Sequence, residues 1–512
     1  MASSDVRDLL LASRLDPPRV AELLAPFGLT DFEKADANLQ SIAGDPSERL
    51  LLADILGDLL ACVSGSANPD QALTYFERFA GASASKSHLF TYLGNSRQAL
   101  EILAKSLGGS AYMAEILIRD PHHFYWVSDP QTLRGTRKKR EIQRDLIRAL
   151  KMLEHEEEQL RYLRAVKRRE MLLIGVRDLL RLSSVEETLD ALSVLAEALI
   201  TAAYGISATA LRRTHNIPPK VFSDFTILAM GKLGGGELNF SSDVDLMFLY
   251  ASNDERAPEI SARDYFRRLA QRITSALSSF TGEGYVYRVD LRLRPEGDAG
   301  NLADPLDGYE RYYRTRMGAW ERLALLKAWP VAGSHSLGRR YLAMSRPFIY
   351  EPGFDRDALA DVRDMKAKMD EKISARGQTG RNVKLGTGGI REIELVVQSI
   401  QARAGAGLPQ ILERNTLRAL EALRDHALIS VEDFETLRRA YLFLRDVENK
   451  LQMVDDAQTH SLPRELEGIT SCARLLGYTP GQSESAAELF LRDLEGHTGR
   501  VHRIFETTVG GR

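Results

Sequence analysis

The chain has 512 residues, of which 44% are hydrophobic, and its formal net charge is −3 at pH 7. This length predicts roughly two or three domains, and the near-neutral charge argues against a general nucleic-acid-binding protein, which would usually show a basic excess. There is no cationic-then-apolar leader, no apolar run is expected to be long enough to cross a bilayer, and the only cysteines are Cys62 and Cys472. These features predict a cytoplasmic protein without a membrane partner.

Helical periodicity dominates the chain except in its middle. From Val6 to about Ala203 the apolar residues recur at three- and four-residue spacing, which predicts a helical assembly. Between about Phe222 and Val331 the pattern changes to short β-rich runs, FTILAM, DVDLMFLY and YVYRVDLRLR, with one amphipathic helix, ARDYFRRLAQRITSALSSF. After Pro347 the helical pattern returns. We therefore expect a predominantly helical α+β fold with a small mixed sheet, divided into a helical region (1–185), a sheet-containing domain (186–335) and a helical bundle (336–512).

Two carboxylates, Asp243 and Asp245, stand one residue apart at the start of the second β-rich run. Strand alternation points both to one face, whereas Val244, Leu246 and Phe248 can serve the packing of the sheet. Like charges this close repel each other, and a divalent cation between them is the usual resolution. Mg²⁺ prefers a few carboxylates together with phosphate oxygens and water, so the pair predicts a site for Mg²⁺, or for Mn²⁺, that serves phosphate chemistry.

A glycine run precedes this pair. Glycine permits a tight turn and lets backbone N–H groups approach a phosphate. An Asp-x-Asp pair alone, or a glycine-rich turn alone, is weak evidence, because both are common on protein surfaces. Their combination predicts a nucleotide- or phosphate-binding site, with these candidate residues: Gly231, Lys232, Gly234, Gly235, Ser241 and Ser242.

A third carboxylate, Asp290, lies in the last β-rich run, YVYRVDLRLR. Strand alternation would place it on one face with Arg288, Arg292 and Arg294. One alternative is an ion-pair ladder along the sheet. The other is a neighbouring strand that delivers a third metal ligand, with the arginines available for phosphates.

Two further features carry less weight. Gly388 and Gly389 stand just before an expected helix whose N-terminal amides can bind an anion, but Glu392 and Glu394 would equally favour a helix start through the helix dipole. We treat these four residues as a candidate border of the site. Trp320, Trp329 and the tyrosines of GYERYYRTRMGAW either belong to the core or stack on a base, and the core is the more frequent place for aromatic residues at helical spacing.

The order of these motifs resembles a known family. A glycine-containing turn, an Asp-x-Asp pair and a third Asp on a later strand are similar to the nucleotidyltransferase superfamily that includes DNA polymerase β. More closely, GKLGGGELNFSSDVDL, YRVDLRLRPEG, WERLALLKAWPVAG and GTGGIREIELVVQ resemble the glutamine synthetase adenylyltransferase/adenylyl-removing enzymes. The likeness extends over most of the chain, from YLGNSRQALEIL to ERNTLRAL.

The resemblance implies a polymerase β-like nucleotidyltransferase domain at 186–335 and an activity in nitrogen metabolism. Enzymes of the family typically carry two catalytic halves, one that attaches AMP from ATP to a tyrosine of glutamine synthetase and one that removes it with phosphate, releasing ADP. This chain has one Asp-x-Asp unit, and its NFSSDVDL and GGIREIEL resemble the adenylyl-removing half. We therefore expect AMP removal from adenylylated glutamine synthetase.

The same resemblance implies that Asp243 and Asp245 bind a divalent metal and that Asp290 completes the site. It implies adenylylated glutamine synthetase, phosphate and ADP or ATP as partners, with the PII signal protein as a further candidate. Two alternatives stay open: an adenylyltransferase that runs the forward reaction, and a non-catalytic regulatory module that binds glutamine synthetase or PII.

Overall fold

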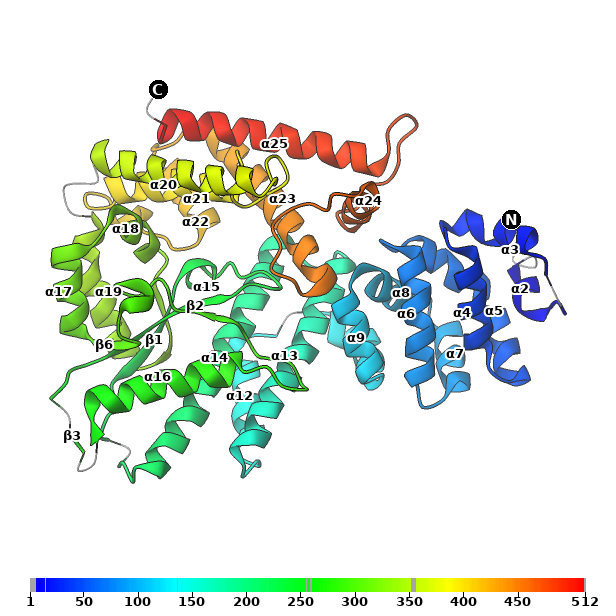
Figure 1. The fold of residues 1–512 in the computed structure, drawn as a ribbon, viewed down its shortest axis with the longest axis horizontal. Helices are drawn as coiled ribbons and strands as arrows, with labels where there is room; N and C mark the ends of the chain where they lie inside the picture. Colours follow the sequence, from blue (N-terminus) through cyan, green and yellow to red (C-terminus); the bar gives the residue numbers. More distant parts are fainter. Residues whose placement is uncertain are drawn as a thin grey trace. The chain divides into compact units, whose positions relative to one another are not determined.

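The computed structural model describes residues 6–13, 15–135, 137–218, 220–254, 256–257, 260–350 and 356–510. The chain folds into two compact units, and each unit collects segments that lie far apart in the sequence (Figure 1). The first unit comprises Met1–Thr136, Arg168–Ser184 and Asn449–Arg492, and the second comprises Arg137–Lys167, Val185–Glu448 and Asp493–Arg512. The division into three consecutive domains stays a prediction.

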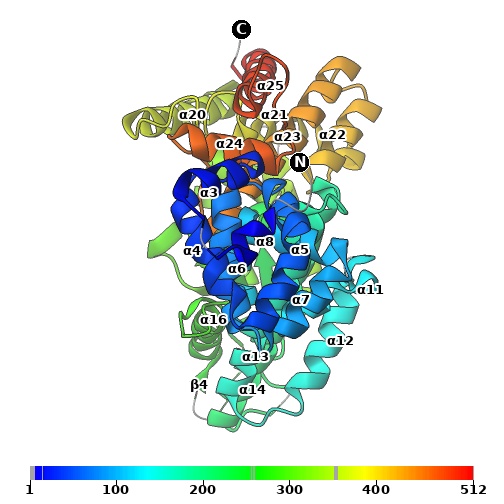
Figure 2. The same cartoon turned by 90° about the vertical axis from the view of Figure 1, so that its right-hand side faces the viewer.

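The first unit is helical. Several of its helices begin at a side chain that accepts a hydrogen bond from a free backbone N–H group of the first turn, which fixes where they start: Asp31, Asp45, Asn68, Ser85, Ser96 and Ser110. Helix α5 packs against α7 and α8 (Figure 2). Helix α6 packs against α4, α8 and α9. The bounds are α2 (Asp8–Leu11), α3 (Pro17–Leu24), η1 (Ala25–Phe27), α4 (Phe32–Ala43), α5 (Pro46–Ser64), α6 (Pro69–Ala82), α7 (Lys86–Gly94), α8 (Arg97–Gly109), α9 (Ala111–Arg119), α10 (His122–Ser128), α11 (Pro130–Leu133) and α24 (Leu466–Leu475).

The second unit is built on a mixed sheet with the strand order β5-β2-β1-β7, in which β6 also pairs with β2. Strand β1 is antiparallel to β2 and β7, whereas β2 is parallel to β5 and β6. The bounds are β1 (Phe225–Ala229), β2 (Val244–Tyr250), β5 (Val289–Asp290), β6 (Ala303–Pro305) and β7 (Trp329–Gly333), with a separate pair of β3 (Arg256–Ala257) and β4 (Ile260–Ser261). The register of β2 and β5 sets Asp245 opposite Asp290.

Helices cover both faces of this sheet. On one face the ring of Phe266 in α16 lies 5.6 Å from Phe225 and 4.6 Å from Tyr250. On the other face Leu228 and Met247 belong to a buried cluster that α17 and α19 complete. The helices with residues in this unit are α12 (Lys139–Leu150), α13 (Glu156–Leu179), α14 (Val185–Thr214), α15 (Gly231–Gly235), α16 (Ala262–Ser278), α17 (Leu306–Arg316), α18 (Ala319–Leu325), α19 (His335–Tyr350), α20 (Arg356–Ala375), α21 (Ile390–Ala404), α22 (Thr416–Asp425), α23 (Val431–Asp455) and α25 (Ala486–Thr508), with short 3-10 turns η2 (Gly297–Ala299) and η3 (Pro409–Ile411). Helices α13, α23 and α25 each contain residues of both units.

The predicted fold class, predominantly helical with a small mixed sheet, is confirmed, and so are β1, β2 and α16. The prediction of a long third strand is wrong, because only Val289–Asp290 is extended and paired. The chain then turns, and the buried guanidinium of Arg294 donates to the carbonyl groups of Leu291, Asp298 and Gly300. Strand alternation therefore does not place Arg294 on the face of Asp290.

The expectation that no apolar run is long enough to cross a bilayer is wrong. Helix α14 is the one described helix that is long and apolar enough by length and composition. More than half of its most apolar stretch is buried inside the protein, where it packs against α12, α16 and β7. Because it also buries Thr188, Ser193 and Glu197, α14 has the character of a core helix.

The aromatic contacts of Phe266 generate a stability prediction. We expect Phe266→Ala to lower the free energy of unfolding by about 3–5 kcal/mol, because the substitution leaves a cavity between α16 and the sheet. The neighbouring exposed Arg267→Ala should change it by less than about 0.5 kcal/mol. Urea unfolding followed by circular dichroism measures both, and equal effects of the two substitutions would show that Phe266 does not support the sheet.

Candidate functional site

The three carboxylates predicted to act together are neighbours in the structure. Asp245 in β2 lies opposite Asp290 in β5, and Asp243 stands immediately before β2. Burial raises the pKa of Asp245 to about 6, and repulsion by Asp290 and Asp243 adds to this effect, whereas the charges of Lys384 and Lys232 oppose it. The site is thus a group of three acids in the field of two lysines.

Arginines hold two of these carboxylates. Arg288 Nε donates to Asp243 Oδ1 at 2.6 Å, and Arg292 Nη2 donates to Asp290 Oδ2 at 2.5 Å. Burial would raise the pKa of Asp290, but the hydrogen bonds from Arg292 outweigh it, and the pKa lies below its usual value. With the carboxylates turned toward the arginines, no group of three His, Cys, Asp or Glu side chains within the described ranges is placed to hold a metal ion.

The donor set nevertheless has the chemistry that a divalent cation requires. Three carboxylates supply hard oxygen ligands of the kind that Mg²⁺ and Mn²⁺ prefer. The repulsion that raises the pKa of Asp245 is the feature that a bound cation would relieve. Asp243, Asp245 and Asp290 are therefore the residues that can hold such an ion, once Arg288 and Arg292 release two of them.

The glycine run forms the short helix α15 between β1 and β2 (Figure 1). Gly231, with φ +53°, is the glycine beside the acids, since a Cβ added there would lie 2.4 Å from Asp245 Oδ2. Gly234 instead packs against backbone, because an added Cβ would lie 2.0 Å from the carbonyl oxygen of Lys327. A side chain is thus excluded at Gly231 by the Asp245 carboxylate and at Gly234 by the backbone of Lys327.

Three consecutive residues, 414–416, donate hydrogen bonds to this turn and to Glu237, which follows it, and we call them the clamp segment. Arg414 Nη1 donates to the carbonyl oxygen of Gly234, and Asn415 Nδ2 donates to that of Gly235 at 3.3 Å. The backbone N–H of Thr416 donates to the carboxylate of Glu237. Residues about 180 positions away thus fix the conformation of the glycine turn.

A buried ammonium completes this arrangement. Lys327 Nζ donates to Glu237 Oε2 at 2.7 Å, to Glu394 Oε1 at 2.9 Å and to Thr416 Oγ1 at 3.2 Å. Burial would lower the pKa of Lys327, but the two carboxylates outweigh it and the pKa is raised. Burial would likewise raise the pKa of Glu394, but Lys327 and Arg391 outweigh it and the pKa is lowered. Lys327 and Glu394 therefore stay charged near neutral pH.

The residues predicted to border the site have structural partners. Glu394 belongs to the ammonium network of Lys327 just described. Glu392 pairs with Lys366 at 3.0 Å and accepts a hydrogen bond from His502 at 3.1 Å. Gly388, with φ +68°, lies against the backbone of α25, where a Cβ would be 1.9 Å from a carbonyl oxygen, and Gly389 is the N-cap of α21. These contacts favour the structural alternative for this motif.

The remaining candidates lie around the acids. Ser241 accepts two hydrogen bonds from Arg288, at its carbonyl oxygen (2.6 Å) and at Oγ (3.2 Å). Ser242 Oγ accepts from the backbone N–H of Asn239 at 3.3 Å. The side chain of Lys232 is 12% exposed and pairs with Glu448 at 2.6 Å.

Sequence reasoning missed Lys384, Lys327 and the clamp segment. Lys384 acts electrostatically on Asp245 and is half-buried. The signal available for Lys384 was its place five residues before Gly389 and two residues before the motif GTGGIREIELVVQ. Lys327 had a weaker signal, a lysine inside the apolar run LALLKAWPVAG, which a buried ion pair explains.

Comparison with known proteins is consistent with this geometry. A family model described as glutamate-ammonia ligase adenylyltransferase matches residues 100–344. A second model, described as GlnD PII-uridylyltransferase, matches residues 363–509. The first match contains all three carboxylates, and the second contains Lys384 and the clamp segment.

Similar proteins carry the name bifunctional glutamine synthetase adenylyltransferase/adenylyl-removing enzyme. The one from Thioalkalivibrio sulfidiphilus is 37% identical over 79% of this chain and 42% of its own length. The one from Rhodopseudomonas palustris strain TIE-1 is 37% identical over 84% of this chain and 44% of its own length. The one from Xanthomonas campestris is 39% identical over 66% of this chain and 36% of its own length. The chain thus spans less than half the length of these relatives.

The ammonium network generates a second stability prediction. We expect Lys327→Met to destabilise the protein by roughly 3–5 kcal/mol, because Glu237 and Glu394 lose their buried counter-ion. Replacing both carboxylates as well, in Lys327→Met/Glu237→Gln/Glu394→Gln, should recover part of the loss. Lys372→Met, an exposed lysine of α20, is the control. If Glu237→Gln and Glu394→Gln instead lower the stability of Lys327→Met further, each by as much as in the wild type, the three groups do not form one network.

Lys232 generates a pH prediction. Burial lowers its pKa to about 7, although Glu448 opposes the shift. The unfolded chain then binds one proton more than the folded chain between about pH 7 and pH 10.5, so this group makes stability rise with pH across that window, by up to about 1.4 kcal/mol per pH unit. We expect urea unfolding with EDTA present to show that the free energy of unfolding of the wild type increases relative to that of Lys232→Met from pH 7 to pH 9. A constant difference would refute the shifted pKa.

Proposed function

Because this chain is a homologue of the bifunctional glutamine synthetase adenylyltransferase/adenylyl-removing enzymes, we propose that it removes AMP from adenylylated glutamine synthetase by phosphorolysis. The observation that supports metal-dependent transfer is the group of Asp243, Asp245 and Asp290, two of them in register on adjacent strands. The choice of removal over attachment rests on the resemblance of NFSSDVDL and GGIREIEL to the adenylyl-removing half. Three neighbouring acids suit metal-dependent phosphoryl transfer. The proposed reaction takes place in the cytoplasm and consumes phosphate.

The proposed step balances without a covalent enzyme intermediate. An oxygen of inorganic phosphate forms a bond to the phosphorus of AMP, the bond from that phosphorus to the tyrosine oxygen breaks, and the proton of the attacking phosphate passes to the tyrosine. The products are ADP and unmodified tyrosine. A divalent cation, when bound, neutralises charge on the phosphate oxygens.

The residues of the chain have distinct proposed roles in this step. Asp243, Asp245 and Asp290 hold the cation. Arg288 and Arg292, released from Asp243 and Asp290, bind phosphate oxygens through their planar guanidinium groups. Lys384 adds positive charge beside Asp245. Gly231 leaves room for an oxygen ligand there, since any side chain would overlap the Asp245 carboxylate.

The C-terminal part of the chain supports a proposal about regulation. Residues 363–509 resemble a family whose name refers to uridylyltransfer onto PII. We therefore propose that the PII signal protein is a regulatory partner of this chain. Co-purification or calorimetry with PII, in its free and uridylylated forms, tests this part independently of catalysis.

The catalytic proposal is tested with adenylylated glutamine synthetase, Mg²⁺ and phosphate, by following ADP release. We expect phosphate-dependent ADP from the wild type and a loss of roughly 100-fold or more in Asp243→Asn and Asp245→Asn, because each removes a metal ligand worth several kcal/mol in the transition state. Asp254→Asn, an exposed carboxylate a few residues past β2, should leave the rate unchanged.

Other outcomes assign the alternatives. If no ADP appears and unmodified glutamine synthetase gains AMP from ATP, the chain is an adenylyltransferase. If neither reaction occurs while glutamine synthetase still binds, the chain is a regulatory module. The first alternative leaves the three acids in the same roles, because one metal site can serve both directions of transfer.

A further inference from the structure

A cavity of about 660 Å³ lies in the second unit between α18, α19, α22 and the segment that leads into α22. Apolar side chains form about half of its wall, with Leu326, Leu342 and Ile349 among the lining residues. The indole of Trp329 also lines it and is 38% exposed, so the expectation that this residue is core is wrong. None of the three carboxylates of the proposed catalytic site lines this cavity. Its size and lining are those of a small-molecule site.

The polar side of the cavity is positively charged. Arg346 of α19, Arg418 of α22 and Arg414 of the clamp segment all line it. Neither Arg346 nor Arg418 forms an ion pair with any residue that the structure describes. The one carboxylate in the lining, that of Glu413, accepts a hydrogen bond from the backbone N–H of Asn415 at 3.1 Å. Two guanidinium groups are therefore available to an anionic ligand.

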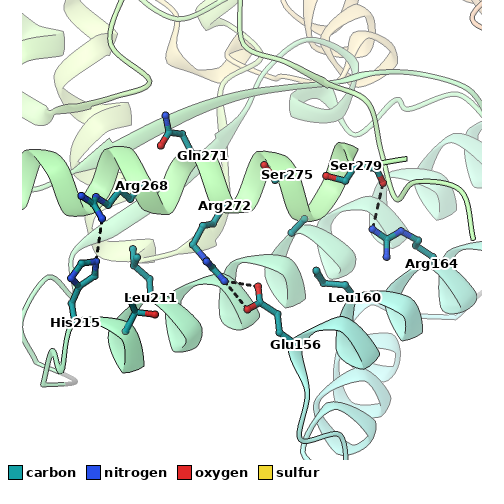
Figure 3. A pocket seen from close by; sticks show the side chains of 12 residues that line it. Glu156, Leu160, Arg164, Leu211, His215, Arg268, Gln271, Arg272, Ser275 and Ser279 are labelled. Carbon is teal, nitrogen blue, oxygen red and sulfur yellow. Dashed lines mark hydrogen bonds and ion pairs between the residues drawn. The ribbon is translucent and has the colours of Figure 1, made fainter. Parts of the chain in front are cut away.

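In a second cavity the arginine side chains of the lining contact groups of the protein. Figure 3 shows this space, of about 480 Å³, which is lined by residues of α13, α14 and α16. There Arg272 makes two 2.6 Å hydrogen bonds to the carboxylate of Glu156, and Arg268 reaches His215 at 3.5 Å. Arg164 donates to a backbone carbonyl at 3.4 Å. These cations contact groups of the protein. Within the described ranges Arg346 and Arg418 form no ion pair, although the charge of Arg418 acts on the carboxylate of Asp190.

Arg414 connects the first cavity to the catalytic site. Its guanidinium lies 4.3 Å from the centre of the Trp329 ring, inside the cavity lining. The same guanidinium donates through Nη1 to the carbonyl oxygen of Gly234. A ligand that moves Arg414 must therefore also act on the glycine turn.

We propose that this cavity binds a small organic phosphate with a flat apolar body, and that Arg414 couples its occupancy to the glycine turn. The body packs against Trp329 and the leucine side chains, and the phosphate pairs with Arg346 and Arg418. Phosphate, which carries nearly two negative charges at neutral pH, matches two guanidinium groups better than a carboxylate does. Binding of the phosphate compound in the cavity does not depend on the proposed reaction. Only an effect of binding on catalysis, through the glycine turn, rests on the proposed function.

Binding is tested by calorimetry on the whole chain with 1-naphthyl phosphate, 1-naphthoate and uncharged 1-naphthol as probes. We expect 1-naphthyl phosphate to bind at least tenfold more tightly than 1-naphthol, with 1-naphthoate between them. Arg346→Gln/Arg418→Gln should weaken the phosphate probe at least tenfold and leave 1-naphthol unchanged. Arg339→Gln/Arg340→Gln, which removes two exposed arginines of α19 outside the cavity, is the matched control.

Two results would overturn the binding assignment. One is equal affinity for the three probes, which would mean that charge plays no part. The other is unchanged affinity for 1-naphthyl phosphate in Arg346→Gln/Arg418→Gln with a native circular dichroism spectrum, which would place the probe elsewhere. Neither measurement needs glutamine synthetase or a metal. The binding result therefore stays valid even if the proposed reaction is not observed.

Coupling is tested by hydrogen exchange of residues 231–236 with and without saturating 1-naphthyl phosphate. We expect exchange of this turn to change at least threefold in the wild type and to be unaffected by the probe in Arg414→Leu. Exchange of α20, which does not line the cavity, serves as the internal control. A wild-type turn that exchanges identically with the probe bound would refute the coupling.

Discussion

The buried ammonium of Lys327, held between Glu237 and Glu394, ties together the parts of the second unit that build the site. It stands just before β7, while its partners lie directly after α15, in α21 and at the start of α22. Removing two carboxylates and an ammonium from water is costly, and the arrangement is stable only while every partner is present. The glycine turn is therefore fixed by charges, and the clamp segment adds hydrogen bonds to its carbonyl groups.

What this fixed turn positions is a group of acids that repel one another. Gly231 and Asp245 are so close that no side chain fits between them, and the sheet register sets Asp290 opposite Asp245. Without a cation, the repulsion is reduced by Arg288 on Asp243 and Arg292 on Asp290. The arginines thus occupy the acids that we propose as metal ligands, and the same groups become available for phosphate when they are released.

The sequence allowed β1, β2, α16 and the proximity of the three acids to be predicted, because each depends on a local pattern of apolar and polar residues. It did not reveal that Glu394, Glu392 and Gly234 contact Lys327, His502 and Arg414, since these contacts join residues that lie about 70 to 180 positions apart. The length of β5 was overestimated for a similar reason: alternation continues through Arg294, but that side chain turns back to loop carbonyl groups. The sequence pattern identified the three acids. The residues that fix their positions could be identified only from the fold.

The most direct test is a crystal structure of the chain grown with Mn²⁺, with the ion located by its anomalous scattering. We expect a single strong peak between Asp243, Asp245 and Asp290, with Arg288 and Arg292 turned away from the carboxylates. A Mn²⁺ ion bound elsewhere, while Arg288 still lies 2.6 Å from Asp243, would contradict the assignment of these three acids as the metal site.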